Sequence, residues 1–150
     1  MGNMYKHGKL FNCCEQFFRH EKIDKHISPE QKSLFMKIAS TFGQGVSHRG
    51  SICGAVSSAA MLLGYKYGTD GTEPSKLFYE KREKLENSMR TLITNFEEAF
   101  GSVNCQELIR FSVWDVKNRE KFLKLLVSGK LNCTDYINFT AKIVDDLLTK

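Results

Sequence analysis

The stretch that decides the fold is Phe42–Gly68, FGQGVSHRGSICGAVSSAAMLLGYKYG. It begins as a loop broken by glycines and continues as a run of small and apolar residues. A helix that is apolar nearly all round is usually buried, and small side chains let neighbouring backbones approach it closely. The stretch therefore predicts a buried central helix over residues 52–67, with other helices packed around it.

The rest of the chain is also typical of helices, because apolar residues recur at three- and four-residue spacings while strand-like alternation is scarce. Ser28-Pro29-Glu30-Gln31 combines a capping serine, a first-turn proline and a glutamine three residues after the cap. The further predicted helices cover residues 10–18, 29–42, 75–100 (as one helix or two), 105–111, 118–128 and 133–148. We expect an all-α, single-domain bundle of about six helices over residues 1–150, with its core at roughly 10–148.

Composition narrows the class of protein. Of the 150 residues, 41% are hydrophobic and 26% are charged, which is ordinary for a soluble globular protein. The formal net charge is +5, but the lysines alternate with acids, as in Glu80–Lys84, which indicates a solvated helix face and no nucleic-acid binding. No apolar run approaches the ~20 residues of a membrane span, and no signal-peptide core is present. We expect a cytoplasmic protein, in which five cysteines favour catalytic, redox or metal-binding roles over disulfides.

Cys53 lies at the N-terminal end of the predicted central helix. The first N–H groups of a helix have no partner inside it, and the macrodipole places partial positive charge there. A thiolate is favoured at such an end, so we expect Cys53 to ionise readily, with Arg49 and His48 just upstream adding to the effect. His48 itself is interpreted as a loop residue. The alternative is that Cys53 is a small buried hydrophobic residue.

Two other cysteines are predicted at helix starts. Cys105 and Cys133 each follow an asparagine, which is a capping residue. On the first helix, Cys14 falls at the centre of the apolar stripe and Cys13 at its edge, so Cys14 is the expected core residue and Cys13 the more available thiol. No C-x-x-C occurs, which leaves neither a zinc-ribbon nor a thioredoxin motif. We expect Cys53, Cys105 and Cys133 to converge at one end of the bundle.

Four segments, taken in order, carry a resemblance to a known family. They are Asn12-Cys13, then Phe42-Gly43-Gln44-Gly45 with Gly50-x-x-Cys53-Gly54-Ala55, then Phe100-Gly101-Ser102-Val103-Asn104-Cys105-Gln106-Glu107-Leu108, and Cys133 at the head of the last helix. This arrangement resembles the C_GCAxxG_C_C family of small redox-active proteins, which is defined by four dispersed cysteines. The resemblance covers roughly Phe11–Leu148.

The chain departs from the family pattern at two positions. Ser58 stands where the motif ends in glycine, and Gln44 interrupts the glycine run. Cys14 has no counterpart in the pattern, in agreement with its expected core position. The resemblance implies a thiol-based role.

Three functions remain open. In the first, Cys13, Cys53, Cys105 and Cys133 bind zinc or an iron–sulfur cluster and transfer electrons to a redox partner. In the second, the chain is a dithiol–disulfide redox protein that uses Cys53 with a resolving cysteine. In the third, it is a non-catalytic helical scaffold that binds other proteins. If the chain is an enzyme, the first two functions make it an oxidoreductase.

Overall fold

The computed structural model describes residues 5–6 and 8–150; residues 1–4 and 7, which the sequence assigns to the single domain, lie outside this part. The all-α class predicted from the sequence is confirmed. A hairpin of β1 (Tyr5–Lys6) and β2 (Lys9–Leu10) is the exception at the start of the chain. The helices are α1 (Cys13–Phe18), α2 (Glu21–Asp24), α3 (Pro29–Ala39), α4 (Gly54–Tyr67), α5 (Ser75–Phe100), α6 (Cys105–Ile109), the 3-10 turn η1 (Val116–Asn118), α7 (Arg119–Val127) and α8 (Cys133–Thr149).

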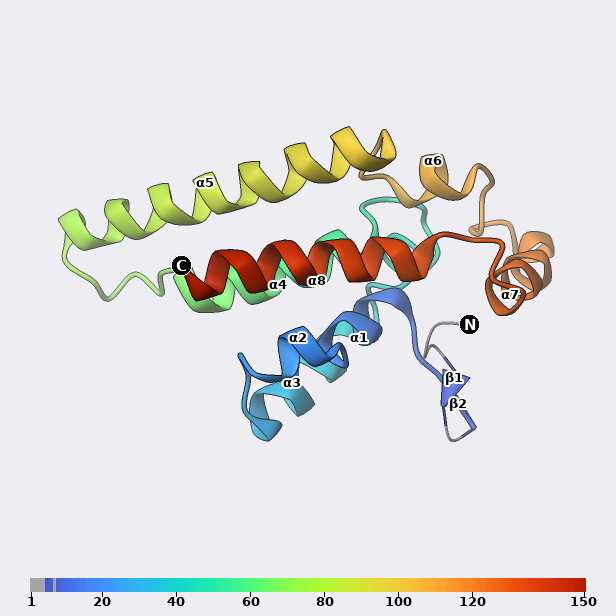
Figure 1. Ribbon diagram of the computed structural model, residues 1–150, viewed down its shortest axis with the longest axis horizontal. Helices are drawn as coiled ribbons and strands as arrows, with labels where there is room; N and C mark the ends of the chain where they lie inside the picture. Colours follow the sequence, from blue (N-terminus) through green and yellow to red (C-terminus); the bar gives the residue numbers. More distant parts are fainter. Residues whose placement is uncertain (1–4, 7) are drawn as a thin grey trace.

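Helix α4 is the centre of the molecule. Helices α1, α5 and α8 all pack against it. In Figure 1, α8 runs along α4, α5 lies above both, and α1–α3 lie below, while α7 forms one end of the elongated molecule. The buried residues of α4 are Gly54, Ala55, Val56, Ser58, Ala59, Leu62 and Leu63. The predicted central helix is therefore confirmed, although it begins at Gly54 and Cys53 is its N-cap.

Small residues at the start of α4 allow α1 to approach it. A Cβ atom added to Gly54 would lie 2.3 Å from Sγ of Cys13, so only glycine fits there without movement. Ser58 is fully buried one turn later, and its hydroxyl donates a hydrogen bond to the carbonyl oxygen of Gly54 at 2.7 Å. The serine is therefore satisfied within its own helix, and its hydroxyl group also faces the Cys14 thiol of α1.

Several helix boundaries differ from the prediction. Helix α1 begins at Cys13 because Asn12 and Glu15 form a capping box there. Helix α2 lies between the predicted helices over residues 10–18 and 29–42, where none is predicted, and it buries Ile23. The described part therefore has eight α-helices in place of about six. The long pattern over residues 75–100 forms one helix.

From the sequence, Leu34 on the apolar face of residues 29–42 and the large ring of Trp114 are expected in the core, and the structure leaves both exposed. On α3, Leu34 is 56% exposed, and the helix buries Phe35 and Ala39 instead. Trp114, whose apolar ring suggests a cap on the core, is 54% exposed, while its neighbour Val113 is buried. Periodicity identifies an apolar stripe, but it does not say how much of the stripe a neighbour covers.

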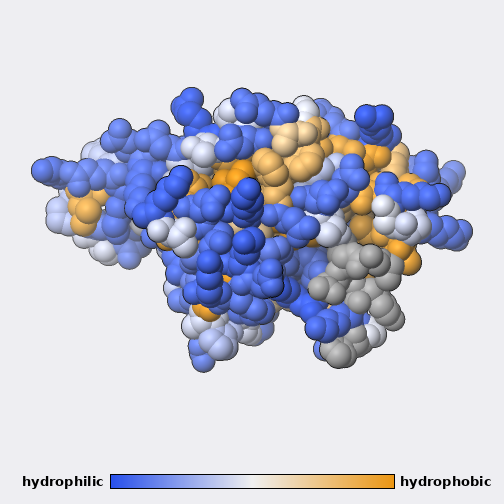
Figure 2. All heavy atoms as spheres, in the orientation of Figure 1, coloured by the Kyte–Doolittle hydropathy of each residue, from blue (hydrophilic) through white to orange (hydrophobic). Residues whose placement is uncertain are grey.

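Polar and apolar surfaces are separated along the molecule. Figure 2 shows hydrophilic side chains over the N-terminal half of α5, which runs past the end of α8 (Figure 1), and apolar ones nearer α7. Of α5, only Ser88, Leu92 and Phe96 are buried. Within the described residues, no helix combines the length and the apolar character that crossing a membrane requires.

Asp145 joins α8 to the segment that follows α2. Its Oδ1 accepts from Nζ of Lys25 at 2.7 Å and from Nε2 of His26 at 2.8 Å. The hydrogen bond from Lys25, and after it that from His26, lowers the pKa of the Asp145 carboxyl group below its ordinary value. The ionised form is therefore the one that holds these two elements together.

Gly54 and Gly64 make a matched pair of substitutions on α4. We expect Gly54→Ala to cost about 1–3 kcal/mol of unfolding free energy, because its methyl group overlaps the Cys13 sulfur. Gly64→Ala meets no atom within 4 Å and should stabilise the helix by about 0.5–1 kcal/mol. Urea unfolding of both variants measures the difference, and equal effects would contradict the close contact of α1 with α4.

The Asp145 contacts predict a pH dependence of stability. A carboxyl group whose folded-state pKa is lowered stabilises the fold above its unfolded-state pKa of about 3.9, and this contribution is lost as the pH falls through the folded-state value. Asp145→Asn should therefore lower the melting temperature at pH 7 and have a smaller effect near pH 3. The exposed neighbour Asp146 supplies the control: Asp146→Asn should leave the melting temperature nearly unchanged at either pH.

Candidate four-cysteine site

Four of the five cysteines line one small cavity, which we call the cysteine cavity. Its room of about 10 Å³ is enough for about one water molecule. Each of these thiols is buried, with 5–8% of the residue exposed. The lining residues are Cys13, Gln44, Cys53, Cys105, Leu108, Ile109, Phe122, Cys133 and Tyr136. The structure places the three cysteines expected to converge, together with Cys13, around this one cavity.

Every cavity cysteine stands at the start of a helix. Cys13, Cys105 and Cys133 are the first residues of α1, α6 and α8, and Cys53 is the N-cap of α4. The unpaired N–H groups at these ends carry partial positive charge. The longer helices α4 and α8 thus direct positive ends at the cavity, which favours negative charge on the sulfurs.

Backbone pairing holds Cys53 beside Cys105. The N–H of Cys53 donates to the carbonyl oxygen of Val103 at 2.7 Å, and the N–H of Cys105 donates to that of Ser51 at 2.7 Å. Between these bonds, Ile52 and Asn104 form an isolated antiparallel bridge. Two thiols that are far apart in sequence are therefore fixed by the main chain, independently of their side chains.

The loop before Cys53 has an unusual left-handed run. Residues 44–48 all have positive φ, from 46° to 71°, and four of the five are not glycine. Left-handed backbone costs a non-glycine residue roughly 1–2 kcal/mol, so the surrounding contacts must hold it in place. A Cβ atom at position 45 would lie 2.4 Å from the backbone nitrogen of Ser51, so only glycine fits there. The run brings Gln44 against the cysteine cavity.

Cys13 occupies a well-anchored position at the start of α1. The side-chain amide of Asn12 donates to the carbonyl oxygens of Ala39 and Ser40 at 3.2 and 3.3 Å, which ties the start of α1 to the end of α3. Backbone N–H groups of Gln44 and Gly54 donate hydrogen bonds to the Cys13 sulfur. The sulfur therefore lies between two main-chain segments that favour its thiolate form.

Burial dominates the acidity of all these thiols. Desolvation raises the pKa of Cys105 to about 12 and raises the pKa of Cys53 and Cys133 as well, and the negative charge of Cys13 adds to the increase in each case. For Cys13 desolvation also raises the pKa, while its backbone donors lower it. Without a cation, these neighbouring thiols oppose one another's ionisation.

The expectation about the acidity of Cys53 is wrong. Cys53 does not ionise readily, since burial raises its pKa well above the ordinary value despite its position at a helix end. The guanidinium group of Arg49 instead faces the ring of Trp114, 5.4 Å from its centroid. Cys13 is 7% exposed against 0% for Cys14, so Cys13 is the more available of the two thiols, as predicted, although both are buried. Cys14 is fully buried, in agreement with its predicted core position.

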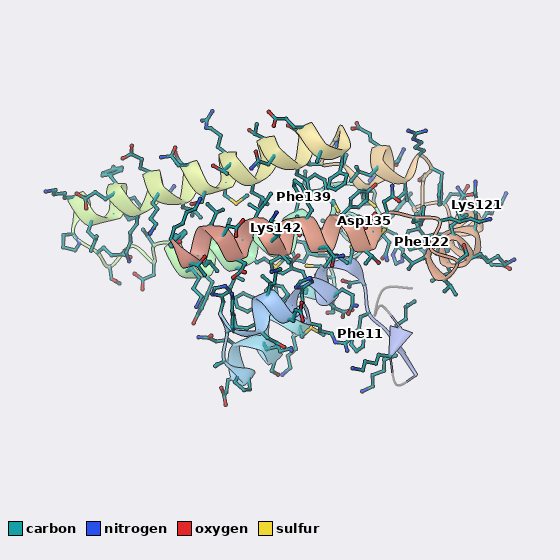
Figure 3. The ribbon with its side chains drawn as sticks, in the orientation of Figure 1. Phe11, Lys121, Phe122, Asp135, Phe139 and Lys142 are labelled. Carbon is teal, nitrogen blue, oxygen red and sulfur yellow. The ribbon has the colours of Figure 1, made fainter. Side chains whose placement is uncertain are left out.

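Aromatic residues close the cavity, and the sequence alone does not single them out. Tyr136 lies one turn after Cys133 and packs against Phe96 and Phe100 of α5. Phe122 comes from α7 and lies near the N-terminal end of α8 (Figure 3). The three-residue spacing from Cys133 is a signal that points to Tyr136, whereas no local pattern connects Phe122 to the cysteines.

The residue types around the cavity favour metal binding, whereas the positions of the sulfur atoms do not form a metal site. Four thiols are the ligands that zinc, iron and iron–sulfur clusters prefer. All five cysteines are free of disulfides. In the part of the chain that the structure describes, however, no three Cys, His, Asp or Glu side chains are close enough together to hold a metal ion. The residue types fit a thiolate-bound metal, and the sulfurs would have to draw together to bind one.

Comparison with known proteins agrees with the cysteine arrangement. A family model described as "Putative redox-active protein (C_GCAxxG_C_C)" matches residues 11–147, nearly the whole chain. Searches of curated proteins and of solved structures returned no match. The four cysteines in the segments that resemble the family pattern are the four that line the cavity. The chain therefore belongs to the C_GCAxxG_C_C family of redox-active proteins.

Proposed function

We propose that this redox protein uses its four cavity cysteines as one thiolate site for a metal ion or an iron–sulfur cluster that transfers electrons. The observation that carries the proposal is the lining of a single buried cavity by four thiols from four helix starts. Thiolates select zinc, copper(I) and iron centres over harder cations. Of these, iron and copper exchange single electrons whereas zinc does not, and iron held by four cysteine thiolates is a common electron-transfer centre.

Electrostatics supports this proposal. Four buried thiols that raise one another's pKa are unfavourable as thiolates, and a bound cation reverses that repulsion. The helix ends of α4 and α8 and the N–H groups directed at Cys13 offset the remaining negative charge. Hydrogen bonds to ligand sulfurs are also among the features that set the potential of such centres.

The size of the cavity favours a small centre. Room of about 10 Å³ suits a single ion once the sulfurs draw together. A cluster with its bridging sulfides requires the walls to move outward, including Phe122 of α7 and Gln44 of the left-handed loop. A single thiolate-bound iron therefore demands the smaller change in structure.

Dithiol–disulfide exchange is the second candidate, and one observation favours Cys13 over Cys53 as its attacking thiol. Only for Cys13 do donors from two other segments, Gln44 and Gly54, point at the sulfur. Two cavity thiols would lose two electrons and two protons to form a disulfide, while a disulfide of the partner would become two thiols. The high pKa values of the cavity cysteines disfavour this reaction at neutral pH.

Metal analysis of a cysteine series tests the proposal. Protein purified without oxygen should contain bound metal, and each of Cys13→Ser, Cys53→Ser, Cys105→Ser and Cys133→Ser should lose most of it and unfold at lower temperature, because metal binding contributes to folding. Cys14→Ala is the matched control: we expect it to cost about 1 kcal/mol of stability and to retain the metal.

Different outcomes select between the candidates. A metal-free protein that loses two free thiols reversibly on oxidation would replace the metal site with dithiol exchange. A metal-free protein in which no serine variant changes thiol reactivity or redox behaviour would leave only the scaffold interpretation. Loss of metal in Cys14→Ala, with the fold intact, would mean that Cys14 is the ligand from α1 in place of Cys13.

A further inference from the structure

A second and larger cavity adjoins the cysteine cavity, and we call it the side pocket. It lies between the start of α1, the left-handed loop and α7, and it holds about 400 Å³. Pockets for small organic molecules measure about 300–1,000 Å³. Gln44 and Phe122 line both cavities, so a single layer of side chains separates the side pocket from the four thiols.

The walls of the side pocket are apolar on one side. Phe11, Phe122 and Leu126 contribute to this surface, and Figure 3 shows Phe11 near the hairpin and Phe122 on α7. Two aromatic rings and a leucine suit a flat apolar molecule better than a sugar or a free amino acid. Apolar lining with a few polar groups is typical of small-molecule sites.

The polar side of the pocket favours an anion. Arg119 lines it, and within the described ranges this guanidinium group has no carboxylate in an ion pair with it. Arg19 adds positive charge nearby, with its guanidinium group 3.8 Å from the centroid of Phe11. The one acidic lining residue, Glu15, already accepts the backbone N–H of Asn12 at 2.8 Å. His48 and Gln44 supply further hydrogen-bonding groups.

We propose that the side pocket binds a small organic anion with a flat apolar body and holds it against Gln44 and Phe122, beside the four cysteines. Arg119 binds the anionic group, and Phe11, Phe122 and Leu126 pack on the apolar body. Binding itself is independent of metal. That the ligand is the substrate or electron partner of the cysteines rests on the proposed function.

Calorimetric titration of the full chain with naphthalene-2-sulfonate tests the pocket. We expect saturable one-to-one binding, which Leu123→Trp weakens by at least about tenfold because the indole fills the pocket. Val127→Trp lies one turn further along α7 and does not line the pocket, so it should change the affinity by less than about twofold. Both positions are at least 41% exposed, so neither substitution overpacks the core.

A second pair of variants tests the anion. Arg119→Gln should weaken the sulfonate about tenfold and leave the uncharged 2-naphthol unaffected. Lys124→Gln, whose lysine pairs with Glu120 at 2.7 Å on the same helix, should change neither. Equal weakening of both probes by Arg119→Gln would overturn the assignment of the anionic group.

Thiol chemistry provides the last readout. Bound naphthalene-2-sulfonate should slow alkylation of the cavity cysteines in the reduced protein, because it covers Gln44 and Phe122 from outside. Absence of saturable binding, or undiminished binding to Leu123→Trp, would refute the pocket, and unchanged alkylation would refute its connection to the thiols. The metal content of the protein is measured in a separate experiment. Absence of metal would therefore reject the proposed function without changing the result of the side-pocket test.

Discussion

The short antiparallel pairing of residues 50–53 with 103–106 is the contact on which the site depends. It consists of main-chain hydrogen bonds, including that from Gln106 N–H to the Gly50 carbonyl oxygen at 3.0 Å, and it joins the approaches to α4 and α6. Between these two segments the chain runs along α4 and returns along α5, whose 26 residues span roughly 39 Å. The pairing brings the chain back to its starting point, so Cys53 and Cys105 meet. Helices α1 and α8 then supply Cys13 and Cys133 by packing on α4.

Two opposing electrostatic effects meet in the cysteine cavity. Helix ends and directed N–H groups favour thiolates, whereas burial and mutual repulsion disfavour them, and in the free protein burial prevails. We propose that such a site keeps its thiols protonated until a cation enters, and then supplies up to four thiolates at once. Binding releases protons, so metal affinity should rise with pH. This balance explains how four buried cysteines can be kept from unwanted disulfide exchange.

Local patterns predicted much of this structure. The small residues of 54–64 predicted the central helix, and asparagine before Cys105 and Cys133 placed both at helix starts, although neither asparagine side chain makes a capping hydrogen bond. The capping box Asn12-x-x-Glu15 also marks Cys13 as a helix start. The apolar stripe that begins at Leu10 instead led to a predicted start at residue 10. Long-range packing set the rest. Phe122 reaches the cavity from α7, and the pKa of Cys53 is raised by the side chains that bury it. Neither feature is specified by residues nearby in the sequence.

The central claim is that four cysteines from four helix starts act as one metal site. X-ray absorption at the metal edge of protein purified without oxygen tests it most directly, because the spectrum counts the atoms bound to the metal and identifies their elements. The account predicts sulfur ligands alone, at about 2.3 Å, with four per metal ion or the equivalent number in a cluster. Nitrogen or oxygen atoms in place of protein sulfur, or fewer than four sulfur ligands, would contradict it.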